Sequence, residues 1–290
     1  MTRLADVLAA TRAEGRAALI GYLPVGFPTL AGSLAAMRVL VESGFDVVEV
    51  GLPYSDPLMD GPVIQHAAQT ALARGLRVRD VFTAVEAVAS AGAAAVVMSY
   101  WNPVLRYGPD AFAADLARAG GSGLIVPDLI PEEAEPWLSA AARHDVDPIF
   151  LVAPTSSRER LRLTARACRG FVYVASTMGV TGVRTEVGGA AGELVARTRE
   201  VTDLPLCVGL GVSTGAQAAQ VAGFADGVIV GSALVRALAS AQSLDEALRA
   251  LRVVAIELRD GIQSAMGPDV TVSAGALAEA PGAEVGRQRR

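Results

Sequence analysis

The sequence contains no lysine and few histidines and cysteines, and each shortage excludes a kind of chemistry. All 25 basic side chains are arginines, so an aldolase mechanism that forms a Schiff base on lysine is impossible. The two histidines, His66 and His144, argue against a histidine-rich metal site. The two cysteines, Cys168 and Cys207, match no metal-binding spacing and indicate a reducing, cytoplasmic setting. Catalysis must therefore rely on carboxylates, hydroxyl groups and backbone amides.

The sequence also lacks the features that mark nucleic-acid-binding, membrane and secreted proteins. The net charge is −5, without a basic stripe, which argues against a nucleic-acid partner. No apolar stretch reaches the roughly 18 residues of a membrane span, and the N-terminus shows no signal-peptide pattern. We therefore expect a cytoplasmic protein without a nucleic-acid or membrane partner.

Apolar, β-rich segments alternate along the chain with segments rich in alanine and leucine. The expected strands are Ala18–Leu23, Asp46–Val50, Ala94–Ser99, Gly123–Val126, Pro148–Val152, Phe171–Ala175, Pro205–Val208 and Gly227–Val230. Their continuous apolar character is typical of parallel strands that are buried on both faces. Eight strands with intervening helices predict an α/β protein with a TIM (β/α)₈ barrel, a fold of about 250 residues. The alternative is a doubly wound open sheet, but an early Gly-x-Gly-x-x-Gly element is missing.

The ends of the chain extend this prediction. A helix over Leu4–Ala13 should cap the barrel floor, and a last helix over Leu244–Ile262 should close the ring. Between them the expected helices include 30–42, 78–90, 132–143, 157–167, 189–200 and 216–222. Residues 1–264 are thus predicted to form one domain. Residues 265–290 contain a Gly-Pro-Asp break and end in Arg-Gln-Arg-Arg, which predicts a disordered, flexible tail.

Two carboxylates mark the candidate active site. Glu49 lies within the apolar run Val47–Val50, where a buried charge is costly unless it is paired or used. Asp60 follows in a proline-rich loop. Functional groups of this fold lie at the C-terminal ends of the strands, so both carboxylates should face the barrel mouth. Desolvation should raise the pKa of Glu49, whereas Asp60, in a polar loop, should remain ionised. The plain alternative is a salt-bridged strand glutamate and a turn aspartate.

The same face should collect aromatic side chains and glycine-rich turns. Tyr22, Tyr100, Asn102, Asp128 and Tyr173 all follow or end expected strands, and several aromatic rings near one carboxylate suit a flat, apolar substrate. Segments 178–182, 208–213 and 230–233 each bring backbone N–H groups to the mouth. The last leads into a helical stretch whose positive end suits an anion, and phosphate binding after strands 7 and 8 recurs in this fold. The alternative is ordinary turn glycines and a serine at a helix N-cap.

Taken together, these motifs resemble those of the tryptophan synthase α chain family over residues 1 to about 263. The resemblance is carried, in family order and spacing, by residues 21–28, 48–67, 127–129, 170–173, 179–182 and 231–233. Three positions depart from the pattern. Many members have an aspartate at the position of Phe27 and a phenylalanine at that of Leu210, and others have a phenylalanine at that of Tyr22.

The resemblance implies a lyase of tryptophan biosynthesis that cleaves indole-3-glycerol phosphate by a retro-aldol reaction into indole and glyceraldehyde 3-phosphate. It implies that Glu49 moves protons at indole C3 and at the glycerol hydroxyl, and that Asp60 takes or stabilises the charge at the indole N1–H. Tyr173 is the candidate that orients Glu49 and the reacting hydroxyl. The implied phosphate ligands are Gly182, Gly211, Gly231 and Ser232. The implied indole pocket comprises Tyr22, Ile64, Met98, Tyr100, Ile125 and Leu210. Segment Thr177–Gly192, with five glycines, is a candidate lid.

The resemblance also implies a partner, the tryptophan synthase β chain, in an α₂β₂ heterotetramer. Pyridoxal phosphate is expected only in that partner, because this chain has no lysine to bind it and should need no cofactor of its own. Candidate contacts are Pro53–Asp60 and Ser99–Pro103. Three alternatives remain open: a free-standing indole-3-glycerol phosphate lyase, another phosphate-binding barrel, and a non-catalytic subunit that activates a β chain.

Overall fold

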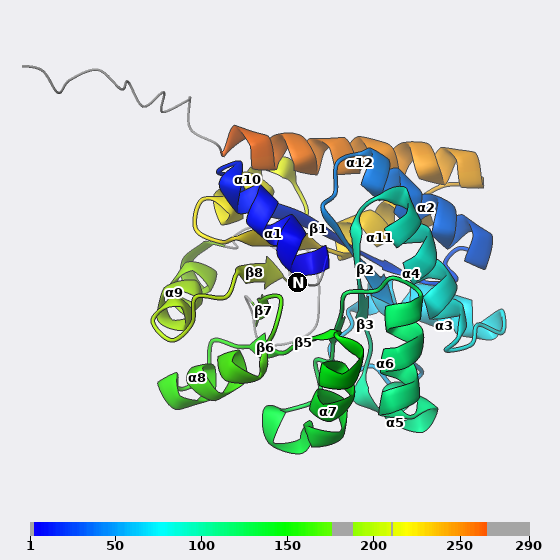
Figure 1. Ribbon diagram of the computed structural model, residues 1–290. Helices are drawn as coiled ribbons and strands as arrows, with labels where there is room; N and C mark the ends of the chain where they lie inside the picture. Colours follow the sequence, from blue (N-terminus) through cyan, green and yellow to red (C-terminus); the bar gives the residue numbers. More distant parts are fainter. Residues whose placement is uncertain (1–2, 176–187, 210, 266–290) are drawn as a thin grey trace, which may run out of the picture.

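The computed structural model describes residues 3–175, 188–209 and 211–265, and its strands form a single parallel sheet. The order of the strands is β5-β4-β3-β2-β1-β9-β8-β7-β6. The bounds are β1 Ala18–Pro24, β2 Val47–Gly51, β3 Ala94–Met98, β4 Gly123–Ile125, β5 Asp147–Ile149, β6 Leu151–Val152, β7 Val172–Ala175, β8 Leu206–Gly209 and β9 Gly227–Val230. The two ends of the sheet, β5 and β6, are separated in the chain by Phe150 alone. The sheet therefore curls into a barrel, which confirms the predicted fold and excludes an open sheet (Figure 1).

The fifth predicted strand, Pro148–Val152, is divided into β5 and β6. Phe150 interrupts the ladder between them, although its carbonyl oxygen still accepts a hydrogen bond of 3.1 Å from the N–H of Tyr173. The nine strands of the described chain thus correspond to the eight that the sequence predicts.

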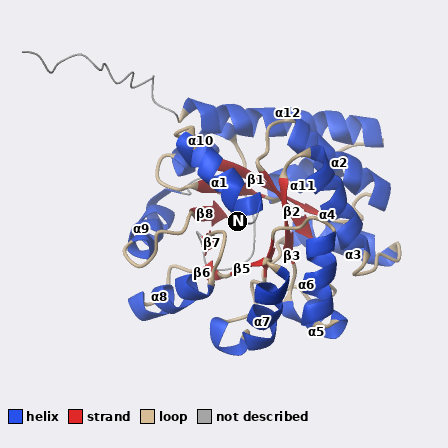
Figure 2. Ribbon diagram, viewed as in Figure 1, coloured by secondary structure: helices blue, strands red, loops and turns tan. Residues whose placement is uncertain are grey.

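Helices surround the barrel, as Figure 2 shows. Their bounds are α1 Arg3–Ala13, α2 Leu30–Glu42, α3 Pro62–Ala73, α4 Asp80–Ala91, α5 Trp101–Tyr107, α6 Pro109–Arg118, α7 Glu135–His144, α8 Arg158–Ala167, α9 Gly188–Arg199, α10 Gly215–Ala222, α11 Ser232–Ala239 and α12 Leu244–Ser264, with a 3₁₀ turn at Pro131–Glu133. The sequence had not singled out α3, α5 and α6. Both α3 and α6 begin with proline, which suits the first position of a helix, and Gly108, at φ 96°, separates α5 from α6.

The barrel interior is filled by apolar side chains from alternate strand positions. Ile20 of β1 and Val47 of β2 are paired in register, and both are completely buried. Leu4 and Leu8 of α1 belong to the same cluster of buried apolar side chains inside the barrel. Full burial of such a side chain contributes about 1.5–3 kcal/mol. The predicted cap on the barrel floor is therefore confirmed.

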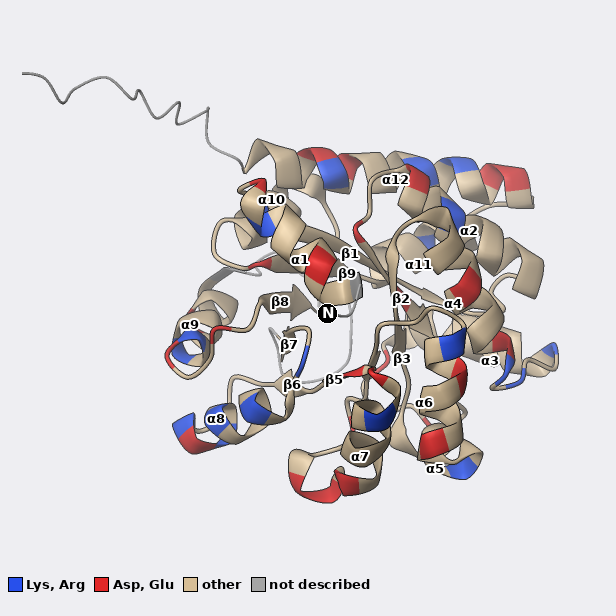
Figure 3. Ribbon diagram, viewed as in Figure 1, with Lys and Arg blue, Asp and Glu red and all other residues tan. Residues whose placement is uncertain are grey.

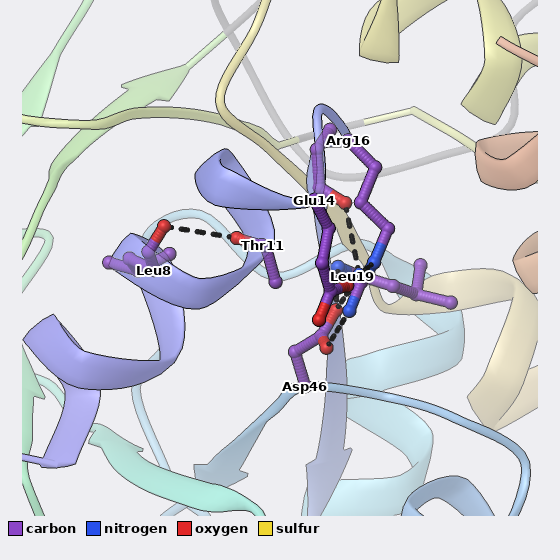
Figure 4. Close-up of polar contacts among 7 residues, drawn as sticks. Leu8, Thr11, Glu14, Arg16, Leu19 and Asp46 are labelled. Atoms are coloured by element: carbon purple, nitrogen blue, oxygen red, sulfur yellow. Dashed lines mark hydrogen bonds and ion pairs between the residues drawn. The ribbon is translucent and has the colours of Figure 1, made fainter. Parts of the chain in front are cut away.

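An ion pair at the floor connects the turn after α1 with the start of β2 (Figure 4). The two terminal nitrogens of Arg16 donate to the two carboxylate oxygens of Asp46, at 2.7 and 2.8 Å. Asp46 also accepts a 2.8 Å hydrogen bond from the backbone N–H of Leu19. The Arg16 pKa is raised, chiefly by the hydrogen bond to Asp46. A bidentate pair of this kind fixes direction as well as distance, so it aligns β1 with β2.

The last helix, α12, packs against α2, α10 and α11 and closes the ring, as predicted. Figure 3 shows acidic and basic residues interspersed on the outer helices. Within the described residues, no helix is both long and apolar enough to cross a membrane. The tail predicted from residue 265 onward lies, apart from Ala265, outside the described residues.

Candidate active site

Glu49 is buried in the middle of β2, where no described residue is a polar partner for it. Its exposed fraction is 1%, and neither carboxylate oxygen accepts a hydrogen bond from another described residue. Desolvation raises its pKa to about 8, which confirms the predicted direction. Such a group is largely protonated at neutral pH and can both give and take a proton there. The salt-bridged strand glutamate, the plain alternative, is thereby excluded within the described structure.

Asp60 lies at the end of the loop that follows β2, and Tyr100 holds it. The Tyr100 hydroxyl donates to Oδ1 of Asp60 at 2.9 Å, and the backbone N–H of Met59 donates to the same hydroxyl at 2.9 Å. Burial raises the pKa of Asp60, while the hydrogen bond from Tyr100 lowers it. The sequence predicted a polar loop around Asp60. In the structure Ser55 of that loop donates to Asp56 at 2.6 Å, and the hydrogen bond from Tyr100 is what favours the ionised form of Asp60.

Two tyrosines flank Glu49 inside the barrel. Tyr22 of β1 is its partner in the strand register. Tyr173 of β7 lies across Gly209, where an added Cβ atom would be 2.1 Å from the tyrosine oxygen. Burial, and then nearby negative groups that include Glu49, raise the pKa of both phenols. Because the Glu49 oxygens accept no hydrogen bond from a described residue, Tyr173 does not hydrogen-bond to them, and its orienting role stays a prediction.

The turn after β9 has the form expected of an anion site. Gly231 is the N-cap of α11, and no side chain caps that helix. Ser232 is the first helical residue rather than the N-cap, so the serine-cap alternative is wrong. The neighbouring strand β8 leads to Gly211, whose φ of 110° favours glycine. Gly182, Leu210 and most of the predicted lid, Thr177–Gly192, lie outside the described residues.

The remaining predicted pocket residues also lie at the barrel mouth. Met98 and Ile125 end β3 and β4, are paired in register and pack against the interior cluster. Ile64 is buried in the first turn of α3, just after Asp60. Farther out, Asp128 accepts a 2.8 Å hydrogen bond from the N–H of Trp101, and Asn102 donates to the Tyr54 hydroxyl at 3.1 Å.

Sequence reasoning missed three contacts around the carboxylates. The amide of Gln65 donates to the carbonyl oxygen of Asp60 at 2.7 Å, and no sequence signal pointed to it, because α3 was not among the expected helices. The ring of Tyr54 packs on that of Tyr100, with 5.4 Å between centroids. Phe27, one of the departures from the family pattern, is buried and contacts His66 edge-on at 6.4 Å. That contact connects the loop after β1 to α3.

Within the ranges that the structure describes, no three His, Cys, Asp or Glu side chains are grouped to hold a metal ion.

Comparisons with known proteins agree with this arrangement. A family model described as tryptophan synthase alpha chain matches residues 8–263. The tryptophan synthase alpha chain of Nocardia farcinica (strain IFM 10152) is 61% identical over 264 residues, which cover 91% of this chain and 97% of that protein. A solved structure of Mycobacterium tuberculosis tryptophan synthase matches with a TM-score of 0.84 at 59% identity, covering 90% of this chain and 98% of that one. The tryptophan synthase alpha chain of Legionella pneumophila matches with a TM-score of 0.83 at 32% identity, covering 92% and 100%. The chain therefore belongs to the tryptophan synthase alpha chain family.

Proposed function

We propose that this chain cleaves indole-3-glycerol phosphate into indole and glyceraldehyde 3-phosphate, as the lyase subunit of tryptophan biosynthesis. The observation that carries the proposal is the buried Glu49, which has no polar partner among the described residues and whose pKa of about 8 suits proton transfer at neutral pH. A glutamate buried there for structural reasons alone would only destabilise the fold. Glu49 lies on barrel strand β2 and Asp60 lies in the loop that follows this strand. This arrangement suits two carboxylates that share acid–base work.

The reaction needs a proton at indole C3, since the ring is a poor carbon leaving group until it becomes an indoleninium. Protonated Glu49 gives that proton, and Asp60 stabilises the positive charge that develops at N1–H. The Glu49 carboxylate then takes the proton of the adjacent glycerol hydroxyl. The carbon–carbon bond breaks, its electron pair returns to the ring, and indole and the aldehyde form. Positioned acid–base groups of this kind contribute about 10²–10⁴-fold each.

The phosphate of the substrate would sit at the N-terminus of α11. Gly231, Ser232 and Gly211 offer backbone N–H groups there, with Gly182 as a further ligand. The partial positive charge of the helix end favours an anion, and a chain without lysine has reason to bind phosphate in this way. Tyr22, Ile64, Met98, Tyr100, Ile125 and Leu210 would then surround the indole.

The partner would be a tryptophan synthase β chain, in an α₂β₂ heterotetramer in the cytoplasm. Among the exposed large apolar side chains of the described residues are Leu58 (71%), Leu105 (51%) and Ile130 (47%). They follow β2, β3 and β4 respectively; Leu58 lies within the candidate contact segment Pro53–Asp60, and Leu105 lies just after Ser99–Pro103. Exposed apolar groups that gather on one face mark interaction sites. Pyridoxal phosphate would belong to the partner, because this chain has no lysine to bind it covalently.

An indole-release assay with purified protein, alone and with a β chain, tests the proposal. We expect slow release from the isolated chain, stimulation by the partner, and at least a 100-fold loss in the Glu49→Gln variant. Asp60→Asn should lose a similar or smaller factor. A variant that retains more than about a tenth of the activity would lack the assigned role. Release without stimulation would favour a free-standing lyase, and no release in either condition would favour a non-catalytic subunit.

A further inference from the structure

The hydroxyl group of Tyr22 occupies space that is available because residue 51 is a glycine. Tyr22 and Glu49 are register partners on β1 and β2. The tyrosine ring extends beyond Glu49 to Gly51, where an added Cβ atom would lie 2.5 Å from the phenolic oxygen. Only glycine leaves that space. The hydroxyl therefore sits at the end of β2, where the loop towards Asp60 begins.

Tyr22 also borders the candidate phosphate turn. A Cβ atom at Gly231 would be 3.4 Å from the Cβ atom of Tyr22. The side chain thus spans the barrel mouth between the anion site and the carboxylates. A substrate that joins a phosphate to an indole must pass along it.

The Tyr22 hydroxyl makes no hydrogen bond to another described residue. Burial raises its pKa first, and the carboxylate of Asp60 has the next largest effect, so the group is a proton donor across the physiological range. The carboxylate of Asp60 also accepts fewer hydrogen bonds from the described residues than its two oxygens allow. Tyr100 donates to its Oδ1 atom, but its Oδ2 atom accepts nothing from the described side chains and backbone.

We propose that Tyr22 is a positioning residue for Asp60, donating a hydrogen bond to its carboxylate when substrate fills the mouth. Tyr22 and Tyr100 then hold the carboxylate from two sides and keep it ionised. Each carboxylate oxygen has two lone pairs, so Oδ2 can accept from both Tyr22 and the indole N1–H. The inference rests on the proposed function of Asp60. It also assigns a role to the hydroxyl that distinguishes this chain from relatives with phenylalanine at this position.

Tyr22→Phe tests the proposal, because it removes one oxygen and keeps the ring. Tyr107→Phe is the matched control: it loses the hydroxyl that donates to Asp115 on α6, away from the mouth. We expect Tyr22→Phe to lower kcat/KM by about 10-fold near neutral pH, since hydrogen bonds to charged groups are the stronger class. Tyr107→Phe should stay within about twofold of the parent protein.

The pH profile separates positioning from packing. Asp60 must be ionised, and loss of a donor raises its pKa, so the acidic limb of kcat/KM should move to higher pH in Tyr22→Phe. The deficit should then shrink as the pH rises. A deficit that is equal at every pH, or an unchanged rate, would overturn the proposal.

A titration without turnover makes the result independent of activity. The ¹³C signal of the Asp60 carboxyl, assigned with Asp60→Asn, is followed against pH in the full chain with indole and inorganic phosphate added. A higher pKa of Asp60 in Tyr22→Phe than in the parent supports the inference, and equal values refute it. Should the parent protein fail to release indole, the proposed function falls, while this titration still decides whether Tyr22 acts on Asp60.

Discussion

Glu49→Gln should stabilise the protein while it removes the activity, and the gain should depend on pH in a defined way. Glu49 carries a pKa raised from 4.5 to about 8 by burial. Below pH 4.5 both the folded and the unfolded chain hold this proton, so the residue contributes no pH-dependent term. Above that value the unfolded chain releases the proton while the folded chain keeps it, which favours unfolding.

The size of the effect follows from the two pKa values. One pKa unit corresponds to 1.36 kcal/mol, so the cost to folding reaches about 3 kcal/mol at pH 7 and approaches about 5 kcal/mol above pH 8. Glutamine has the same shape and does not ionise. Its buried amide lacks partners just as the carboxylic acid does, and that penalty does not change with pH. The difference in the free energy of unfolding between variant and parent should therefore increase from pH 4.5 to pH 8 and then level off.

Urea unfolding at pH 5, 6, 7 and 8 measures this difference. Glu86→Gln, on the exposed face of α4, serves as the control and should give a constant difference. A Glu49→Gln difference that is also independent of pH would show that Glu49 is either paired or solvated in the folded protein. In that case the assignment of Glu49 as a proton carrier near neutral pH would lose its physical basis.

Four further changes test other parts of the structure. Gly231→Val should raise the KM for indole-3-glycerol phosphate and weaken competition by inorganic phosphate, because the new side chain crowds the turn; an unchanged phosphate inhibition constant would place the anion elsewhere. Asp46→Asn should lower the free energy of unfolding by about 2–3 kcal/mol, since it removes the charged partner of the two terminal nitrogens of Arg16 and leaves only Glu14, at Nε. A difference below about 0.5 kcal/mol, the usual size of a surface effect, would contradict a stabilising role for this ion pair. Leu58→Asp should weaken β-chain binding in a titration calorimeter without slowing the isolated lyase, and equal affinity would remove this side chain from the interface. Deletion of residues 269–290 should alter neither indole release nor its stimulation, and a loss of stimulation would give the tail a role in the complex.

The barrel and the two carboxylates could be predicted because each depends on a local pattern. Apolar strands alternating with helical segments leave few ways to bury both faces of a parallel sheet. Glu49 drew attention as a charge inside an apolar strand, and its raised pKa followed from its valine neighbours alone. The candidate anion site at Gly231 is also a local prediction, since it rests on a glycine that precedes a helix.

Tertiary structure decided which groups support these residues. Tyr100 is 40 positions from Asp60 in the chain, and only the barrel brings its hydroxyl to 2.9 Å from the carboxylate. The division of one predicted strand at Phe150 arises where the sheet closes on itself. Gly51 and Gly209 make room for Tyr22 and Tyr173, which lie on other strands. Such contacts depend on register and ring direction across the barrel, and these are fixed by packing between segments that are far apart in the sequence.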